Sequence, residues 1–354
     1  MFKRAILTSV LLLTSAFPAY SEFPDATMNI ISTINGDISP KSVRSSGNGL
    51  VSAHNMMYRH SVTIYDAKSK SLVATVSDQI NLANFGVTGF KGLHRGAPVE
   101  GSYSPDGKYL YVTNYATYGY GFKKEGTDIC RPSDGYDYSF LYRINLESYS
   151  IDAIYKVGVV PKVVEATPDN KYILVTNWCS YDLSVISVEK QRVIKTISIG
   201  AYPRGIVVTK DSKTAYIAHM GGSDIKKIDL NNLTSTTIKF GSNPRALVLS
   251  PDEKTLYATL NAAGKVVAFD LEKNIMINGV KTGEAARSLT ISPDGSYLYA
   301  VNFNSATMTK VRTSDFKKIQ TLKVCVDPIG ITYEPTDNKV WVACYKGQIK
   351  VVTP

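Results

Sequence analysis

Short apolar runs separated by turn residues recur along the chain in a fixed order. Each unit opens with a short apolar stretch, passes through an aspartate-containing turn such as Pro168-Asp169, and continues into a run rich in tyrosine and valine. Five openings follow one another at steps of 42, 41, 42 and 42 residues, beginning at Gly158, Gly200, Gly241, Gly283 and Cys325. Two further openings, Pro40-Lys41 and Pro98-Val99, lie upstream and bring the number of units to seven.

A unit of about 42 residues with several short alternating strands is typical of a β-propeller blade. The last unit holds only three expected strands, over residues 329–333, 340–344 and 348–352. The segment 28–34 resembles the fourth strand of other units, for example residues 193–199. We therefore predict an all-β, seven-bladed propeller, a single domain over residues 22–354. The amino-terminal strand completes the last blade and closes the ring, which hides the two exposed sheet edges.

The first 21 residues are expected to be a secretory signal peptide. Lys3 and Arg4 precede the apolar residues 5–13, and Ala19-Tyr20-Ser21 places small residues before a cleavage point at Glu22. The apolar stretch is too short to span a membrane, and no later segment approaches ~18 uninterrupted apolar residues. An apolar core helix is the alternative. The prediction is a bacterial protein of the periplasm or exterior, exported by a Sec-type signal and without a membrane span.

Composition and charge narrow the class further. With 23 tyrosines, 25 glycines and 15 prolines, the chain favours strands and turns over an all-α fold. The formal net charge is +10, and +8 remains after Lys3 and Arg4 are subtracted with the signal peptide. A basic protein attracts anionic partners.

The four cysteines are spaced by 49, 146 and 19 residues, which matches no zinc-binding pattern. In an oxidising compartment, disulfides are the expected state. The repeat phase places Cys130 in an insert beside the strand that ends at Cys179, and it places Cys325 and Cys344 at one end of neighbouring strands. We predict the pairs Cys130–Cys179 and Cys325–Cys344.

The residue that follows each opening is basic in most units. Across the seven blades this position reads Lys41, Val99, Lys162, Arg204, Arg245, Arg287 and Ile329. The innermost strand of a propeller blade begins at the entrance of the central channel, so these five cations should ring the channel mouth. Like charges focused by low-dielectric walls attract anions. The alternative is that each cation pairs with a carboxylate, for which Glu100 and Glu165 are available.

Two extra loops, residues 81–97 and 115–137, are expected on the same face. Long loops are commonly functional. Tyr118, Tyr120 and Phe122 alternate with glycine in the second loop, and Trp178 lies in the next blade. Such rings suit the stacking of bases or sugars beside cations. Alternatively, the loop folds over a small core of its own and Trp178 packs between blades.

Candidate metal ligands and catalytic groups are few. His54 and His219 fall near the channel mouth and are candidates for a transition-metal site, with loop hydrogen bonding as the alternative. The sequence has no G-x-S-x-G, H-E-x-x-H, P-loop or G-x-G-x-x-G in its required context. We therefore predict no catalytic residue and no cofactor, and a divalent metal remains an alternative.

Three segments carry a four-residue motif at the end of a predicted strand: Tyr111-Val-Thr-Asn114, Leu174-Val-Thr-Asn177 and Tyr299-Ala-Val-Asn302. On these residues the repeats resemble the YVTN β-propeller family, which includes YncE-like periplasmic proteins of bacteria. The resemblance covers the chain after the signal peptide and implies four-stranded blades. It also implies single-stranded DNA as the first candidate ligand, with acidic glycans or a protein partner next.

The resulting hypothesis is a monomeric, non-catalytic binding protein that holds an anionic ligand on its basic face. One alternative is a hydrolytic propeller similar to lactonases, with a metal in the channel and Asn114 and Asn177 as the nearest ligands. Another is a redox-partner propeller, similar to the propeller subunit of amine dehydrogenases. No haem-attachment motif C-x-x-C-H is present for the latter.

Overall fold

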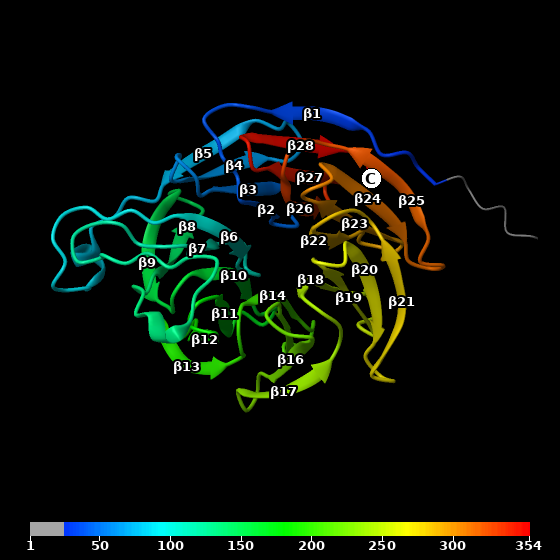
Figure 1. Ribbon diagram of the computed structural model, residues 1–354. Helices are drawn as coiled ribbons and strands as arrows, with labels where there is room; N and C mark the ends of the chain where they lie inside the picture. The colour runs from blue at the N-terminus through cyan, green and yellow to red at the C-terminus, as the bar shows by residue number, and fades with distance from the viewer. Residues whose placement is uncertain (1–24) are drawn as a thin grey trace, which may run out of the picture.

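Seven four-stranded antiparallel sheets surround a central opening in the computed structural model, which describes residues 25–354 (Figure 1). This arrangement confirms the predicted seven-bladed propeller. The predicted signal peptide, residues 1–21, lies outside the described residues. Within residues 25–354, no helix is long and apolar enough to cross a membrane.

The blades follow one another along the chain. Blade one comprises β2 (Ser42–Ser45), β3 (Leu50–Asn55), β4 (Ser61–Asp66) and β5 (Leu72–Ser77). Blade two comprises β6 (Pro98–Tyr103), β7 (Tyr109–Asn114), β8 (Phe140–Asn145) and β9 (Ser150–Lys156). Blade three comprises β10 (Pro161–Ala166), β11 (Tyr172–Asn177), β12 (Asp182–Ser187) and β13 (Arg192–Ser198). Blade four comprises β14 (Pro203–Val208), β15 (Thr214–His219), β16 (Asp224–Asp229) and β17 (Thr234–Lys239).

The remaining blades repeat this order. Blade five comprises β18 (Pro244–Leu249), β19 (Thr255–Leu260), β20 (Lys265–Asp270) and β21 (Ile275–Lys281). Blade six comprises β22 (Ala286–Ile291), β23 (Tyr297–Asn302), β24 (Thr307–Arg312) and β25 (Lys318–Lys323). Blade seven comprises β26 (Pro328–Glu334), β27 (Lys339–Cys344), β28 (Gln348–Val352) and β1 (Ile30–Ile34). Two short 3-10 helices, η1 (Leu82–Phe85) and η2 (Pro132–Asp134), lie in the two extra loops.

Blade seven closes the ring with strands from both ends of the chain, as predicted. Strand β1 pairs antiparallel with β28, and Figure 1 shows the two side by side. The residues before β1 also bind blade six: the Met28 amide donates to Gln320 Oε1 at 2.7 Å, and the Tyr297 hydroxyl donates to Asp25 Oδ1 at 2.6 Å. The amino-terminal segment therefore joins blades six and seven.

The apolar core lies between neighbouring blades rather than at the centre of the ring. Tyr111 and Leu141 of blade two pack against Val164 and Val175 of blade three, and equivalent clusters fill the other boundaries. A second strand such as β11 is buried on both faces, whereas an outermost strand such as β21 is almost entirely exposed. Side chains of the first strands that point away from these clusters line the channel.

Two disulfides, Cys130–Cys179 and Cys325–Cys344, confirm both predicted pairs. Their Cα atoms are 5.5 Å and 6.1 Å apart. The first bond joins the β7–β8 loop of blade two to the end of β11 in blade three. The second joins the segment before β26 to the last residue of β27, at one end of this strand pair in blade seven.

Candidate anion-binding site

In blades three to six the mouth cation lies directly after the first residue of the innermost strand, whereas Lys41 directly precedes β2 in blade one. In blades three to six, this residue lies in a register shift, for example between Pro161 and Val164 or between Pro244 and Leu247. A β-bulge of this kind re-aims the side chain that it contains. The sequence thus repeats a bulge that turns one side chain per blade toward the axis.

The residue before each of these strands has a left-handed backbone. In blades three to six the φ angles are 53° at Val160, 57° at Tyr202, 54° at Asn243 and 53° at Ala285. This conformation is unfavourable for non-glycine residues, and for β-branched Val160 most of all. Its recurrence in four blades indicates that the path into the bulge is held by the surrounding fold.

Threonine hydroxyls of one blade hold the backbone of the cation in the next blade. Thr113 Oγ1 donates to the Lys162 carbonyl at 2.7 Å, and Thr176 Oγ1 donates to the Arg204 carbonyl at 3.0 Å. Thr259 Oγ1 donates to the Arg287 carbonyl at 2.9 Å. Thr113 and Thr176 are the third residues of the four-residue motif, so the motif contributes directly to the placement of the mouth cations.

The asparagine of the motif has a different role within its own blade. The Asn177 side-chain amide donates to Asp182 Oδ1 at 2.6 Å and to Ser184 Oγ at 2.9 Å. The Asn114 amide donates to the Phe140 carbonyl at 3.0 Å. Both asparagines are fully buried. They connect the second strand to the third and do not extend into the channel.

The structure brings the five predicted cations close enough to shift each other's ionisation. Burial, followed by Arg204, Arg245 and Arg287, lowers the pKa of Lys41 to about 7. Burial, followed by Arg204 and Lys41, lowers the pKa of Lys162 well below its ordinary value. Burial also lowers the pKa of Arg287 to about 10. Cations contributed by five blades therefore form one electrostatic unit, which we call the cation ring: Lys41, Lys162, Arg204, Arg245 and Arg287.

Two carboxylates of residues 25–354 lie within 4 Å of ring cations, so the five cations exceed these close carboxylates by three charges when all seven groups are ionised. Arg204 lies 3.8 Å from Glu100, and Lys162 lies 3.5 Å from Asp128 of the β7–β8 loop. Arg245 is 5% exposed, and its guanidinium has no hydrogen bond or ion pair within residues 25–354. A buried cation without a counter-ion is costly, and a bound anion removes that cost.

The expected carboxylate partners of the cations are only partly present. Glu100 does approach Arg204, but Glu165 pairs at 2.5 Å with Arg44, a residue of β2 outside the cation ring. Asp327 influences Arg287 and lies 3.9 Å from Lys346. Neutralisation of every mouth cation by its own carboxylate is therefore not what the structure shows.

Aromatic rings support three of the five cations. Lys41 Nζ lies 5.0 Å from the ring centre of Tyr345, Lys162 Nζ lies 4.3 Å from that of Tyr115, and Arg287 Cζ lies 3.6 Å from that of Phe303. Such contacts stabilise a cation without neutralising it. Each ring follows directly on the last residue of a second strand, and this recurring aromatic is a sequence signal that the repeat analysis missed.

A cavity of about 420 Å³ occupies the channel below the cation ring. Arg204, Arg245 and Arg287 line it toward the mouth, and Ser45 and Thr332 line it further along the first strands. This volume falls within the usual range of small-ligand pockets.

The four aromatic residues predicted to form a stacking platform differ in exposure. Trp178 is 8% exposed and packs on Tyr202 at 4.6 Å between ring centres, and Phe122 stacks on Phe90 at 4.9 Å inside the two extra loops. Tyr118 and Tyr120 are 36% and 62% exposed. Only these two tyrosines present substantial ring surface to a ligand.

The two candidate metal-binding histidines lie apart, in blades one and four. His54 is buried, its Nδ1 lies 2.7 Å from Ser42 Oγ, and burial lowers its pKa to about 3. His219 Nδ1 lies 2.7 Å from Asp224 Oδ1. Residues 25–354 contain no group of three or more His, Cys, Asp or Glu that could hold a metal ion. With Asn114 and Asn177 bonded inside their blades, the residues present do not fit the divalent metal considered for a lactonase-like enzyme.

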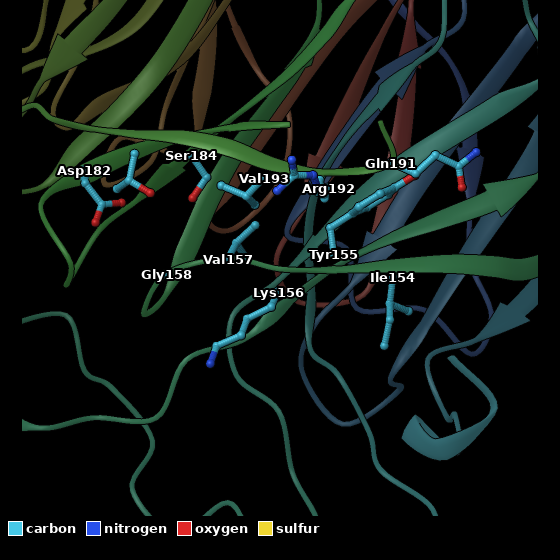
Figure 2. Close-up of a pocket in the computed structure, with 11 residues that line it drawn as sticks. Ile154, Tyr155, Lys156, Val157, Gly158, Asp182, Ser184, Gln191, Arg192 and Val193 are labelled. Atoms are coloured by element: carbon cyan, nitrogen blue, oxygen red, sulfur yellow. The ribbon is translucent and has the colours of Figure 1, made fainter. Parts of the chain in front are cut away.

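A second groove of about 480 Å³ lies between the outer strands of blades two and three (Figure 2). Figure 2 shows Lys156 at the end of β9 and Asp182 at the start of β12 on its walls. Asp182 already accepts a hydrogen bond from Asn177, and none of the predicted site residues lines this groove. The groove lies where the outer strands of adjacent blades separate.

Comparisons with known proteins agree on the fold. The family described as lactonase, 7-bladed beta-propeller, matches residues 222–338. A chain from the crystal structure of a mitotic checkpoint complex is similar with a TM-score of 0.74 and 12% identity, over 98% of this chain and 99% of that one. No match was found among curated proteins. At this identity the structural likeness supports the propeller architecture alone.

Proposed function

We propose that the protein is a non-catalytic binding module whose cation ring holds an anionic ligand. The observation that carries this proposal is Arg245, a buried guanidinium that forms no hydrogen bond or ion pair within residues 25–354 and is repelled by Arg204 and Arg287. Repulsion and desolvation both oppose such an arrangement, and a ligand anion relieves both. The cavity of about 420 Å³ below the ring provides the space.

Single-stranded DNA is the first candidate ligand, because the motif ending at Asn114 resembles that of YncE-like proteins. The exposed rings of Tyr118 and Tyr120 support this candidate, since bases stack on aromatic faces while cations meet phosphate. An acidic glycan or an acidic protein partner would use the same charge. The two disulfides support a periplasmic or secreted location, because such bonds persist in oxidising compartments.

Binding isotherms with an oligodeoxynucleotide and with inorganic pyrophosphate, each at two salt concentrations, test this proposal. We expect polymer affinity to fall steeply with salt, with a logarithmic slope of about −0.7 per phosphate neutralised. The double substitution Arg204→Gln and Arg245→Gln should weaken both ligands by about 100-fold or more, since each buried charge-assisted contact is worth ~1.5–3 kcal/mol. Arg192→Gln, at an exposed arginine on the outermost strand of blade three, is the matched control.

Binding of both anions by the double variant with unchanged affinity would refute the cation ring as the site. Tight pyrophosphate binding with no measurable oligonucleotide binding would instead retain the ring and exclude the polymer. The two outcomes separate the charge of the ligand from its identity.

Lactone hydrolysis is the second candidate function, because the lactonase family matches residues 222–338. The described residues do not fit the channel metal expected for such an enzyme, so we derive no catalytic step. Hydrolysis of simple lactones, assayed with and without added divalent cations, provides the test. Turnover that is abolished by chelation would favour this second candidate over the binding module.

A further inference from the structure

The tip of the β7–β8 loop places one carboxylate beside the cation ring. Asp128 Oδ1 lies 3.5 Å from Lys162 Nζ, and its side chain is 85% exposed. Although burial opposes the shift, Lys162, Lys41 and Arg204 lower the pKa of the Asp128 carboxyl. Asp128 in turn influences the pKa of all five ring cations. Glu100 also interacts with ring cations, namely Arg204, Arg245 and Lys41, but it lies on the first strand of blade two rather than on a loop.

The loop backbone at this tip is fixed to blade three, whereas the Asp128 side chain is largely exposed. Trp178 Nε1 donates to the Asp128 carbonyl at 3.1 Å, and the disulfide Cys130–Cys179 follows two residues later. The Tyr202 hydroxyl donates to the Cys130 carbonyl at 3.2 Å. The carboxylate is therefore held near the ring by its backbone and bound there by a single cation.

Gly126 explains how the loop approaches blade three so closely. A Cβ atom at Gly126 would lie 2.4 Å from Val160 Cγ2, which is too short for any side chain. Val160 is the left-handed residue that precedes β10 and the ring cation Lys162. The absent side chain at residue 126 therefore lets the loop tip rest directly on the segment that positions Lys162.

We propose that Asp128 is a tethered internal counter-ion, which occupies part of the cation ring until an incoming anion displaces it. This inference rests on the proposed function and adds a selectivity to it. A ligand with one negative charge only replaces the charge of Asp128, whereas a ligand with several negative charges also neutralises the cations that Asp128 leaves unpaired. The site should therefore favour compact multivalent oxyanions, such as di- or triphosphates and polycarboxylates, over monovalent anions.

Calorimetric titration with inorganic pyrophosphate and with acetate tests this proposal on wild type and on Asp128→Asn. We expect the variant to bind pyrophosphate about tenfold more tightly, because a unit of repulsion a few ångströms from the ligand is worth at least that factor. We expect acetate to give no measurable binding with wild type and weak binding with the variant. Asp37→Asn is the matched control, because Asp37 is 80% exposed, pairs with Arg59 and carries the same charge. It should leave both affinities unchanged.

A second variant distinguishes the effect of the disulfide that holds the loop tip from the effect of the Asp128 charge. Replacing Cys130 and Cys179 by serine releases the loop tip while keeping the carboxylate, and pyrophosphate affinity should again rise, by a smaller factor. An unchanged or weaker affinity of Asp128→Asn, with wild type binding pyrophosphate, would overturn the internal counter-ion and leave the proposed function intact. Absence of pyrophosphate binding in every variant would overturn both.

Discussion

The charged side chains at the two ends of the first strand differ in how they are bonded. At the end away from the mouth, five blades carry a hydroxyl–aspartate turn: Ser104/Asp106, Thr167/Asp169, Thr209/Asp211, Ser250/Asp252 and Ser292/Asp294. In blade six, Asp294 accepts from the Ser292 hydroxyl at 2.5 Å and from the Ser296 amide at 3.1 Å. At the mouth end, Arg245 has no such partner. A repeated charge that is fully bonded contributes to the fold, whereas one left unbonded indicates a binding role.

The largest loss of stability should follow a substitution in the hydroxyl–aspartate turn of blade six. Asp294→Ala removes the acceptor of three hydrogen bonds, including one from the Ser296 hydroxyl at 2.6 Å, and should destabilise the fold by about 2 kcal/mol. Solvent exposure of the turn keeps the loss at the lower end of what three bonds would give. Chemical denaturation measures the change, and pyrophosphate affinity should stay within about twofold of wild type.

Glu272→Ala is the matched control for this substitution, because Glu272 is an exposed acid in a turn of the adjacent blade whose side chain has no partner within residues 25–354. Its removal should leave the free energy of unfolding unchanged within about 0.5 kcal/mol. If Asp294→Ala weakened anion binding as strongly as a ring substitution, the division of roles between the two ends would be wrong.

The second prediction concerns the pH dependence of anion binding at the cation ring. Free Lys41 has a pKa lowered to about 7 by burial and by its three arginine neighbours, so it is charged below pH 7 and neutral above. A bound anion favours the charged form and raises this pKa, so binding above pH 7 takes up a proton and affinity falls as pH rises. We expect sulfate, which does not titrate in this range, to bind about tenfold more weakly at pH 8.5 than at pH 6.5.

Lys41→Arg provides the control for this pH dependence. Arginine stays charged throughout the range, so the slope should flatten to whatever Lys162 contributes. Calorimetry in two buffers of different ionisation enthalpy would count the protons taken up. A flat wild-type profile would show that Lys41 is not coupled to the anion.

The repeat phase alone was sufficient to predict the ring closure by residues 28–34 and the common position of Arg204, Arg245 and Arg287. Both follow from a period that the fold must obey, because each blade has to meet its neighbour in the same way. The disulfides followed from the same phase. All of these features follow from the repeat period of the blades.

Features outside the period could not be predicted. Asp128 lies in an insert whose path depends on contacts with Trp178 and Val160, and no repeat constrains them. Aromatic residue type also does not distinguish a packed ring from an exposed one: Trp178 and Phe122 are packed, whereas Tyr120 is 62% exposed. The hydrogen bond from Thr176 to the Arg204 carbonyl could not be predicted from the motif, because its acceptor is a backbone carbonyl of another blade.

The smallest predicted effect is a gain in stability when Arg245 is replaced. Arg245→Met replaces a buried, unpaired guanidinium by an apolar side chain of similar length. It should raise the free energy of unfolding by about 1 kcal/mol in buffer of low ionic strength, since both desolvation and repulsion from Arg204 and Arg287 disappear. Arg192→Met, on an exposed strand, should change stability by less than about 0.5 kcal/mol.

Sulfate should reverse this order of stability. A ligand that binds only the folded state stabilises it in proportion to the logarithm of its concentration over Kd, so wild type should gain more from sulfate than Arg245→Met does. At saturating sulfate the wild type becomes the more stable protein. Loss of stability in Arg245→Met without sulfate would mean that Arg245 contributes to the fold as Asp294 does, and the two ends of the strand would then no longer differ in kind.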